Sequence, residues 1–374
     1  MAQSSNVLDL FIKLASINSY VAQEGKLAQD LISRLKNLGA TVTVDDSAAK
    51  TGSDTGNIIA TLPGKVAGAP RILLCAHMDT IGPTEGMVPE LRDGIVYSNG
   101  KTVLGADDKA GIAVILTTLE QLQKDGTPHG DLEIVFTVQE EPGLVGAKNL
   151  TAELKSDFGY ILDGDGAVGT IIHRAPAKVD LDLTLVGQAA HAGICPEEGV
   201  NAIVTASTAI SRLHSGRIDR ETTSNIGTIR GGQTRNIVPD QVEIAAEVRS
   251  LDDSKLDREV EIMLGEFSKA AKEFNAQFTF KKNISFRSFN VAESHPATTI
   301  AVRAARSIGV EPTLWASGGG LDANIFNGRG LPCVALGLGV ENPHSHQEYV
   351  PASQLEEGVR LLSAILQNAA GASS

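Results

Sequence analysis

Histidines and carboxylates come directly after several short apolar runs of the sequence. The runs are ILLCA, LEIVFTV, YIL and CVALGLG, and each ends close to a residue that can bind a metal ion. These residues are His77, Asp79, Glu140, Glu141, Asp163 and His344, with Asp107 and Asp108 at the start of a helical pattern. Neutral imidazole and carboxylate are ligands that suit zinc, manganese or cobalt. The pattern therefore indicates a metal site built from several strand ends.

Apolar runs that alternate with helical patterns predict the sheet that would bring these residues together. The runs have the continuous apolar character of buried parallel strands, and they lie at 57–62, 71–76, 132–138, 160–162 and 331–338. Helical spacing marks the segments 7–17, 24–39 and 106–122. In an open α/β sheet, ligands bind outside the carboxyl ends of the strands. We therefore expect an α/β fold in which a mixed, largely parallel sheet is sandwiched by helices, with the metal site at one edge.

The middle of the chain has a different pattern, which predicts an inserted α+β domain. Residues 178–186 alternate strictly between polar and apolar, as in a strand with one wet face. Together with the segments that follow, they give the order β-α-β-β-α-β of a ferredoxin-like unit. The further strands are expected at 224–230, 241–249 and 277–284, and the helices at 201–213 and 255–274. We therefore expect a catalytic domain at 1–176 and 288–374, interrupted by a ferredoxin-like domain at 177–287.

The composition excludes several classes of function. The 374 residues suit two domains, and the formal net charge is −13 with no cluster of Lys and Arg that nucleic-acid binding requires. The three cysteines lack CxxC spacing, which argues against a thiolate zinc site. No apolar run approaches the roughly 18 residues of a membrane span, and the first fourteen residues lack the basic and apolar segments of an export signal. We expect a cytoplasmic protein with neither nucleic-acid nor membrane partners.

Simpler interpretations account for some of the polar residues. Asp107 and Asp108 could be acids that favour a helix N-terminus, which explains one of the two. A single histidine is more often a satisfied surface or core residue, and this interpretation is given to His129, His173, His214 and His295. Neither interpretation explains His77-x-Asp79, in which Asp79 can accept the second imidazole N–H and so fix the ring.

Longer segments resemble the family of dizinc exopeptidases and deacylases, and within it the peptidase T-like members. The matching segments are LLCAHMDT, GADDKAG, VQEEPGLVGA, ILDGDG, GQAAHAGICPEEGVNAI, GGQTRNIVPD, EVRSLD, SGGGLDANIF and PHSHQEYV. They span almost the whole chain in the family's order. The family includes peptidase T, glutamate carboxypeptidase, aminoacylase and succinyl-diaminopimelate desuccinylase. The resemblance implies that the inserted domain is a lid, and that two lids pair in a homodimer.

The resemblance also implies a ligand set for two divalent metal ions. His77, Asp107 and Asp163 would hold one ion. Asp107, Glu141 and His344 would hold the other, so that Asp107 bridges them. Asp107 is chosen because the family pattern is Asp-x-Lys, and His344 because it opens a His-x-x-x-Glu segment. The ions are expected to be zinc, with cobalt or manganese as alternatives, and they could share a hydroxide and grip both the attacking oxygen and the substrate carbonyl.

Further roles follow from the same resemblance. Glu140 would be the general base that takes a proton from the attacking water and returns it to the leaving amine. His191, in the motif GQAAHAG, resembles a lid histidine that donates to the carbonyl oxygen. Asn236 and Arg249 match lid residues that contact the carboxylate end of the substrate.

The sequence therefore predicts a metal-dependent peptidase that hydrolyses short peptides by an aminopeptidase or tripeptidase-like route. The alternative is a deacylase or carboxypeptidase that acts on N-acyl amino acids with the same metal centre. A third hypothesis, a small-molecule binding protein without catalysis, is disfavoured because Glu140 accompanies a full ligand set. A serine hydrolase is unsupported because the sequence has no G-x-S-x-G elbow.

One segment departs from peptidase T itself. Where peptidase T has Arg-Gly-Gly-Thr-Asp, this chain has GGGLD at 318–322, so that Gly318 takes the arginine position. Guanidinium is the best bidentate partner for a carboxylate, so one anchor for a tripeptide C-terminus is missing, and Arg249 remains as the main cationic anchor. Alternatively, the glycines form only a tight connection before a helix, where positive φ angles are common.

Overall fold

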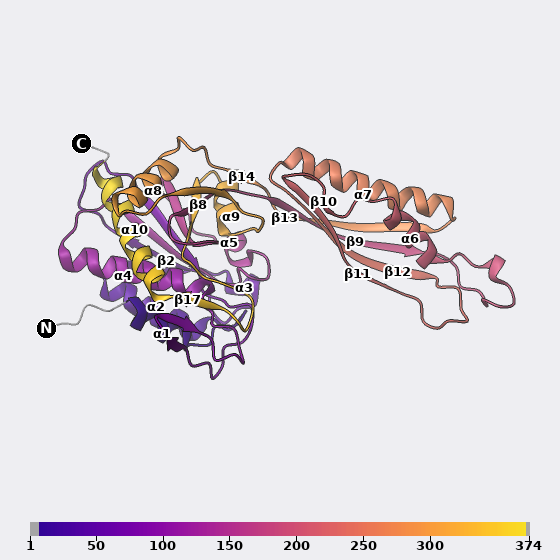
Figure 1. The fold of residues 1–374 in the computed structure, drawn as a ribbon, viewed down its shortest axis with the longest axis horizontal. Helices are drawn as coiled ribbons and strands as arrows, with labels where there is room; N and C mark the ends of the chain where they lie inside the picture. The colour runs from indigo at the N-terminus through magenta and orange to yellow at the C-terminus, as the bar shows by residue number, and fades with distance from the viewer. Residues whose placement is uncertain (1–6, 372–374) are drawn as a thin grey trace. The chain divides into compact units, whose positions relative to one another are not determined.

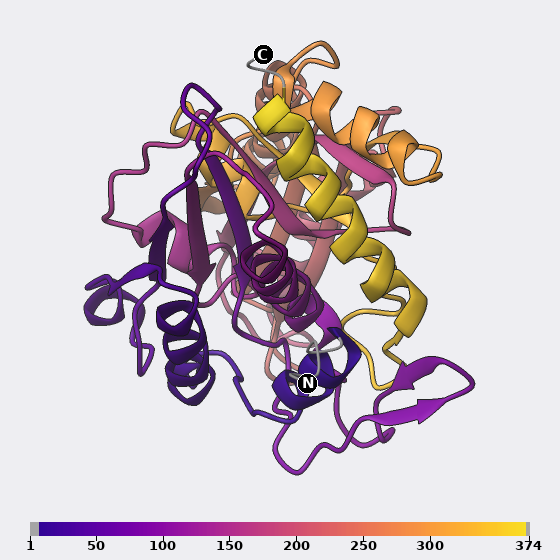
Figure 2. The same ribbon diagram turned by 90° about the vertical axis from the view of Figure 1, so that its left-hand side faces the viewer.

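The computed structural model describes residues 7–371 and divides into two compact units (Figure 1), of which the left-hand one faces the viewer in Figure 2. Unit 1 comprises the chain up to Arg174 and from Asn290 onward, and unit 2 comprises Ala175–Phe289. The chain enters unit 2 once and leaves it once, so unit 2 is an insertion. Residues 1–6 and 372–374, which the sequence assigns to the catalytic domain, lie outside the described residues.

The main sheet of unit 1 has a parallel centre flanked by antiparallel strands. Its order is β1 (Thr41–Val44), β2 (Ile58–Leu62), β6 (Leu132–Thr137), β3 (Ile72–His77), β7 (Phe158–Gly164), β16 (Cys333–Gly337), β8 (Thr170–Ala175) and β14 (Phe289–Asn290), with β15 (Thr313–Ala316) paired to β8. The pairs β6–β3, β3–β7 and β7–β16 are parallel, whereas β1–β2, β2–β6 and β16–β8 are antiparallel. The central strands β3 and β6 are buried along their whole length, as their continuous apolar runs predict.

Helices cover both faces of this sheet (Figure 1). On one face α10 (Ala352–Gly371) packs on α4 (Ala106–Asp125) and α8 (Pro296–Ser307), and α1 (Val7–Ala15) packs on α4, with α2 (Gly25–Asn37) beside them. The short helices α3 (Ala48–Thr51), α5 (Val145–Asn149) and α9 (Asp322–Gly328) pack on one another. A small antiparallel sheet of β4 (Glu90–Arg92), β5 (Ile95–Tyr97) and β17 (Tyr349–Pro351) completes unit 1. The predicted α/β sandwich is confirmed.

Unit 2 has the predicted ferredoxin-like topology. Its sheet has the order β10 (Gly216–Arg217), β11 (Thr222–Gly231), β12 (Gln241–Ser250), β9 (Ala177–Val186) and β13 (Gln277–Phe286). Helices α6 (Ala202–Ser211) and α7 (Asp253–Glu273) pack on the sheet. Each begins at a residue whose side chain accepts helix N–H groups, Asn201 for α6 and Asp252 for α7. The alternation along β9 buries one face of the strand, because Val179, Leu181, Leu183 and Leu185 join a core with both helices.

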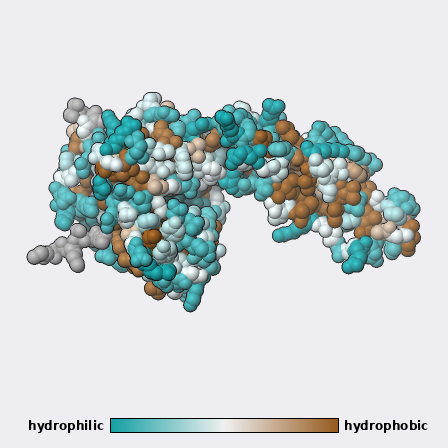
Figure 3. Space-filling view, in the orientation of Figure 1, coloured by the Kyte–Doolittle hydropathy of each residue, from teal (hydrophilic) through white to brown (hydrophobic). Residues whose placement is uncertain are grey.

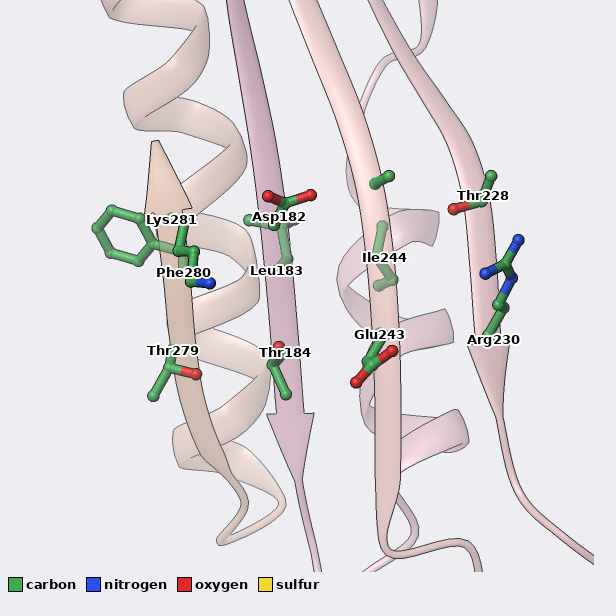
Figure 4. Close-up of a pocket in the computed structure, with 11 residues that line it drawn as sticks. Asp182, Leu183, Thr184, Thr228, Arg230, Glu243, Ile244, Thr279, Phe280 and Lys281 are labelled. Carbon is green, nitrogen blue, oxygen red and sulfur yellow. The ribbon is translucent and has the colours of Figure 1, made fainter. Parts of the chain in front are cut away.

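The opposite face of the unit 2 sheet is polar and slightly hollow. Cross-strand neighbours there include Arg230 with Glu243 and Asp182 with Lys281, and they flank the small residue Ala245 in a shallow cavity of about 460 Å³ (Figure 4). Hydrophobic groups are gathered on the part of unit 2 that the space-filling view shows (Figure 3). Among residues 7–371, most of the large apolar side chains with high exposure belong to this unit, including Ile229 and Phe280. No helix in the described part of the chain is both long and apolar enough to cross a membrane.

Candidate metal centre

The parallel centre of the main sheet brings the predicted metal-binding residues to one edge. His77 is the last residue of β3, and Asp163 is near the end of β7. Glu140 and Glu141 follow β6, and His344 follows β16. Because β6, β3, β7 and β16 are neighbours that run in the same direction, their carboxyl ends lie along one edge of the sheet.

The carboxylate of Asp107 lies between the two histidines. Asp107 Oδ1 is 2.9 Å from His77 Nε2, and Asp107 Oδ2 is 3.2 Å from His344 Nε2. The remaining carboxylates fall into the same two groups. Asp163 Oδ1 is 3.9 Å from His77 Nε2, and Glu141 Oε2 is 3.0 Å from His344 Nε2. One aspartate therefore connects a group that contains His77 and Asp163 with a group that contains His344 and Glu141.

The donor atoms of these groups fit divalent metal ions. The ligand atoms of His77, Asp107 and Glu141, which come from both groups, all lie within 4.8 Å of one another. Glu141 Oε1 is buried and has no hydrogen-bond partner among the described residues, so it has a free lone pair to offer a cation. Imidazole nitrogen with carboxylate oxygen is a donor set that suits zinc, cobalt or manganese.

Asp108 lies close to the same atoms but is engaged differently. Its ligand atom lies within 4.8 Å of those of His77 and Asp163. However, Asp108 Oδ2 accepts the His77 backbone N–H at 3.2 Å, and Oδ1 accepts the N–H of Gly111 at 3.1 Å. Both oxygens of Asp108 therefore bind backbone amides, whereas both oxygens of Asp107 face imidazole rings.

Asp79 holds the loop that carries the two adjacent glutamates. Its Oδ1 accepts the N–H of Glu140 at 2.8 Å, and its Oδ2 accepts the N–H of Glu141 at 3.1 Å. The imidazole of His77 donates from Nδ1 to the backbone oxygen of Asp79 at 3.0 Å, with the nearer carboxylate oxygen at 3.4 Å. This donation orients the ring so that Nε2, which faces Asp107 Oδ1, is the nitrogen that could bind a metal ion.

The electrostatics of the centre reflect several carboxylates in a small volume. Burial raises the pKa of Asp163 well above its usual range, and the charges of Asp107 and Asp108 raise it further. Burial also acts to raise the pKa of Asp107, but the imidazoles of His344 and His77 reverse this and hold it below its usual range. The carboxylates of Asp107 and Glu141 raise the pKa of His344 to about 10. In the absence of other cations, protonated histidines thus supply the positive charge that the carboxylates require.

Glu140 lies among these groups without binding an imidazole in the way that Glu141 does. Burial raises its pKa well above the usual range, His77 opposes the shift, and the nearby charges of Asp322 and Asp79 increase it. A raised pKa suits a carboxylate that must hold a proton between two steps of a reaction.

The predicted lid residues lie in unit 2 at two separate places. His191 and Asn236 are both exposed. They belong to neighbouring segments, because His191 forms an antiparallel β-bridge with Ile237 and the N–H of Ala192 donates to Asn236 O at 3.0 Å. Arg249 is near the other end of the sheet, where it pairs with Lys178 at the start of β9. Its guanidinium binds Glu247 at 2.9 Å. Lys178 and Val186, near the two ends of β9, are eight residues apart, which corresponds to roughly 26 Å at about 3.3 Å per residue. Arg249 lies beside Lys178, whereas His191 follows the end at Val186.

Several buried groups at the centre were not predicted from the sequence. Glu24 Oε1 accepts the N–H of Gln139 at 3.1 Å, just before the two glutamates. Asp322 Oδ2 accepts from the Thr137 hydroxyl at 2.6 Å, at the end of β6. Lys109 is fully buried and donates to Ile17 O at 2.7 Å, and burial lowers its pKa to about 7. Asp322 and Lys109 lie inside segments that carry the family resemblance, whereas nothing in the local sequence distinguishes Glu24.

A protein-family model described as Peptidase family M20/M25/M40 matches residues 73–368. The chain belongs to this peptidase family. The matched region begins in β3 and includes the five predicted ligands, so the metallopeptidase class predicted from the sequence is confirmed. Among related sequences, the uncharacterized protein YqjE of Bacillus subtilis (strain 168) is 38% identical over 99% of this chain and 100% of its own length. Peptidase T of Escherichia fergusonii is 28% identical over 84% of this chain and 86% of its own length.

Solved structures resemble this M20-family peptidase over nearly its whole length. Aminopeptidase PepT from Bacillus cereus ATCC 10987 has a TM-score of 0.94 and 39% identity, covering 98% of this chain and 99% of its own. A tripeptidase from Staphylococcus aureus subsp. aureus Mu50 has a TM-score of 0.96 and 35% identity, covering 99% of both chains. The YXEP protein of Bacillus subtilis, described as a dinuclear metal binding peptidase from the M20 family, has a TM-score of 0.74 and 18% identity, covering 97% of both chains.

Proposed function

We propose that this M20-family peptidase removes the first residue of short peptides with the help of two divalent metal ions. His77, Asp107 and Asp163 would hold one ion. Asp107, Glu141 and His344 would hold the other. The observation that carries this proposal is the position of Asp107, whose two oxygens face different histidines at 2.9 and 3.2 Å. The similarity of the whole chain to an aminopeptidase and a tripeptidase supports peptides rather than N-acyl amino acids as substrates.

The chemistry divides between the metal ions and the protein. Ions bound by these residues would polarise the scissile carbonyl and lower the pKa of the attacking water. Glu140 would take the proton of that water as it attacks the carbonyl carbon, and would then give it to the amine as the C–N bond breaks. Asp79 supports this role because it holds the backbone N–H groups of both Glu140 and Glu141. His191 would donate to the carbonyl oxygen as negative charge develops there.

The first prediction concerns metal dependence and substrate class. Chelation should abolish hydrolysis, and zinc, cobalt or manganese should restore it, with about two ions per chain. A panel of dipeptides, tripeptides and N-acyl amino acids should show faster turnover of peptides with a free amino group. Full activity in chelator would contradict the metal mechanism. Faster turnover of N-acyl amino acids would favour the deacylase alternative instead.

The second prediction separates the two adjacent glutamates. Glu140→Gln should keep both metals but lower kcat by about 10²–10⁴-fold, because it removes a general base. Glu141→Gln should instead weaken one metal site, because Glu141 Oε2 faces His344 and Oε1 has no hydrogen-bond partner among residues 7–371. Metal content by elemental analysis and kcat should be measured on both variants. Equal metal content together with equal residual rates would show that the roles are wrongly assigned.

The third prediction concerns the carboxylate end of the substrate. A Cβ at Gly318 would meet no atom within 4 Å, and the φ angle of Gly318 is outside the left-handed region. The backbone therefore does not require glycine where peptidase T has arginine, which favours a difference in substrate recognition. We expect weak selectivity for tripeptides and, for Arg249→Ala, a large rise in KM for a tripeptide but not for its C-terminal amide. Equal rises on both substrates, or strict tripeptide preference of the wild type, would contradict this assignment.

The fourth prediction concerns a homodimer through the lid. A tripeptide spans about 10–11 Å when extended, so within one copy of unit 2 it cannot contact both Arg249 and the pair His191–Asn236. The exposed apolar side chains of unit 2 support pairing with a second copy. If the partner subunit's His191 completes each site, mixed subunits of the inactive variants His191→Ala and Glu140→Gln should regain about a quarter of wild-type activity. A monomer in sedimentation, or no recovery on mixing, would contradict this arrangement.

A further inference from the structure

A buried carboxylate outside the ligand set joins two segments of the metal centre. Glu348 is 1% exposed and lies four residues after His344, directly before β17. Its Oε2 accepts the N–H groups of Leu104 and Gly105, each at 2.8 Å. Its Oε1 accepts the N–H of Asp107 at 2.9 Å. One side chain near the end of the sequence therefore binds three backbone amides of segment 104–107.

Segment 104–107 offers no side chain that could replace these contacts. It leads into α4, whose backbone is not helical at Asp107 and Asp108, so its buried N–H groups need partners from other parts of the chain. Gly105 has no side chain, and its φ angle of +72° favours glycine. A Cβ at Gly105 would also lie 2.9 Å from Thr80 Cγ2. Glu348 thus supplies partners for these amides from a distant part of the chain.

The same contacts connect Asp107 to the segment of His344. Asp107 is held at its backbone by Glu348 Oε1, and its side-chain Oδ2 is 3.2 Å from His344 Nε2. The turn between His344 and Glu348 is closed by the N–H of Glu348, which donates to Ser345 O at 3.2 Å. A movement of segment 104–107 away from Glu348 would therefore change the separation of Asp107 and His344.

We propose that Glu348 is a positioning residue that sets the separation of Asp107 and His344, and so governs metal binding by Asp107, Glu141 and His344. This inference rests on the proposed function. The other ion would be held by Asp107 together with His77 and Asp163, whose places are set by the pairing of β3 with β7. Loss of the Glu348 carboxylate should therefore weaken one metal site more than the other.

A second buried glutamate provides a matched control. Glu133 is 4% exposed, and its Oε2 accepts the N–H of Lys155 at 2.8 Å and the hydroxyl of Ser156 at 2.6 Å. It lies near the beginning of β6, whereas the metal centre lies beyond the end of that strand. Glu133→Gln should lower stability in the same way as Glu348→Gln, but without an effect on the metal centre.

The experiment compares Glu348→Gln, Glu348→Asp and Glu133→Gln with the wild type in the full chain. Glutamine keeps the size of the side chain but turns an NH₂ group toward one of the three amides. Zinc titration of metal-free protein should show that Glu348→Gln weakens the ion held by Asp107, Glu141 and His344 about 10–100-fold. The ion held by His77, Asp107 and Asp163 should be weakened less, because Asp107 is the one ligand that both ions share. kcat should fall with little change in KM, Glu348→Asp should recover part of the loss, and Glu133→Gln should bind both ions normally.

Two results would overturn the role of Glu348. One is a Glu348→Gln variant that binds both ions as the wild type does. The other is that Glu348→Gln and Glu133→Gln weaken the binding of both ions to the same extent and lower Tm equally. Glu348 would then have a structural role only. Hydrogen exchange of metal-free protein tests the contacts directly, and segment 104–107 should exchange faster in Glu348→Gln. A wild type that binds no metal would contradict the proposed function instead. Unaltered exchange of segment 104–107 in metal-free Glu348→Gln would contradict the role of Glu348 itself.

Discussion

Buried carboxylates that accept backbone N–H groups hold the metal centre in place. Asp79 binds the loop after β6, Asp108 binds the end of β3, and Glu348 binds the segment before α4. In each case the amides belong to the segment that leaves a strand or enters a helix, where regular hydrogen bonding stops. A buried amide or carboxylate without a partner costs about 1–3 kcal/mol or more, so these bonds strongly favour one arrangement. The loops that carry the reactive side chains gain an order that loops usually lack.

The same centre contains more negative charge than its surroundings can stabilise. Burial raises the pKa of Asp163 and of Glu140, and neighbouring carboxylates raise both further. Protonated His344 offsets part of this charge, which explains its raised pKa. A divalent cation offsets it more compactly, because one ion interacts with several oxygens at once. The crowding of acids that is costly for folding is thus also what makes the edge of the sheet selective for cations.

The clustering of His77, Asp163 and His344 is predictable because each follows an apolar run, and parallel strands end at one edge. Alternation along 178–186 likewise predicts β9 and its buried face. The strands β4 and β5 are not predictable, because each has only three residues and is too short to show a periodic pattern. The contacts of Glu24 and Glu348 are also beyond prediction from one sequence. They join residues 115 and 244 positions apart, and a carboxylate that binds backbone amides leaves no signature in its partners.

The first and last strands of unit 2 are neighbours. β9 and β13 run antiparallel, and Lys178 at the start of one pairs with Phe286 at the end of the other. The two points at which the chain crosses between the units therefore lie side by side, like the ends of a hairpin. Such an insertion can be lengthened, exchanged or lost in evolution without breaking the sheet that receives it. Substrate selectivity, if it depends on unit 2, is then free to diverge while the hydrolytic edge of unit 1 is inherited intact.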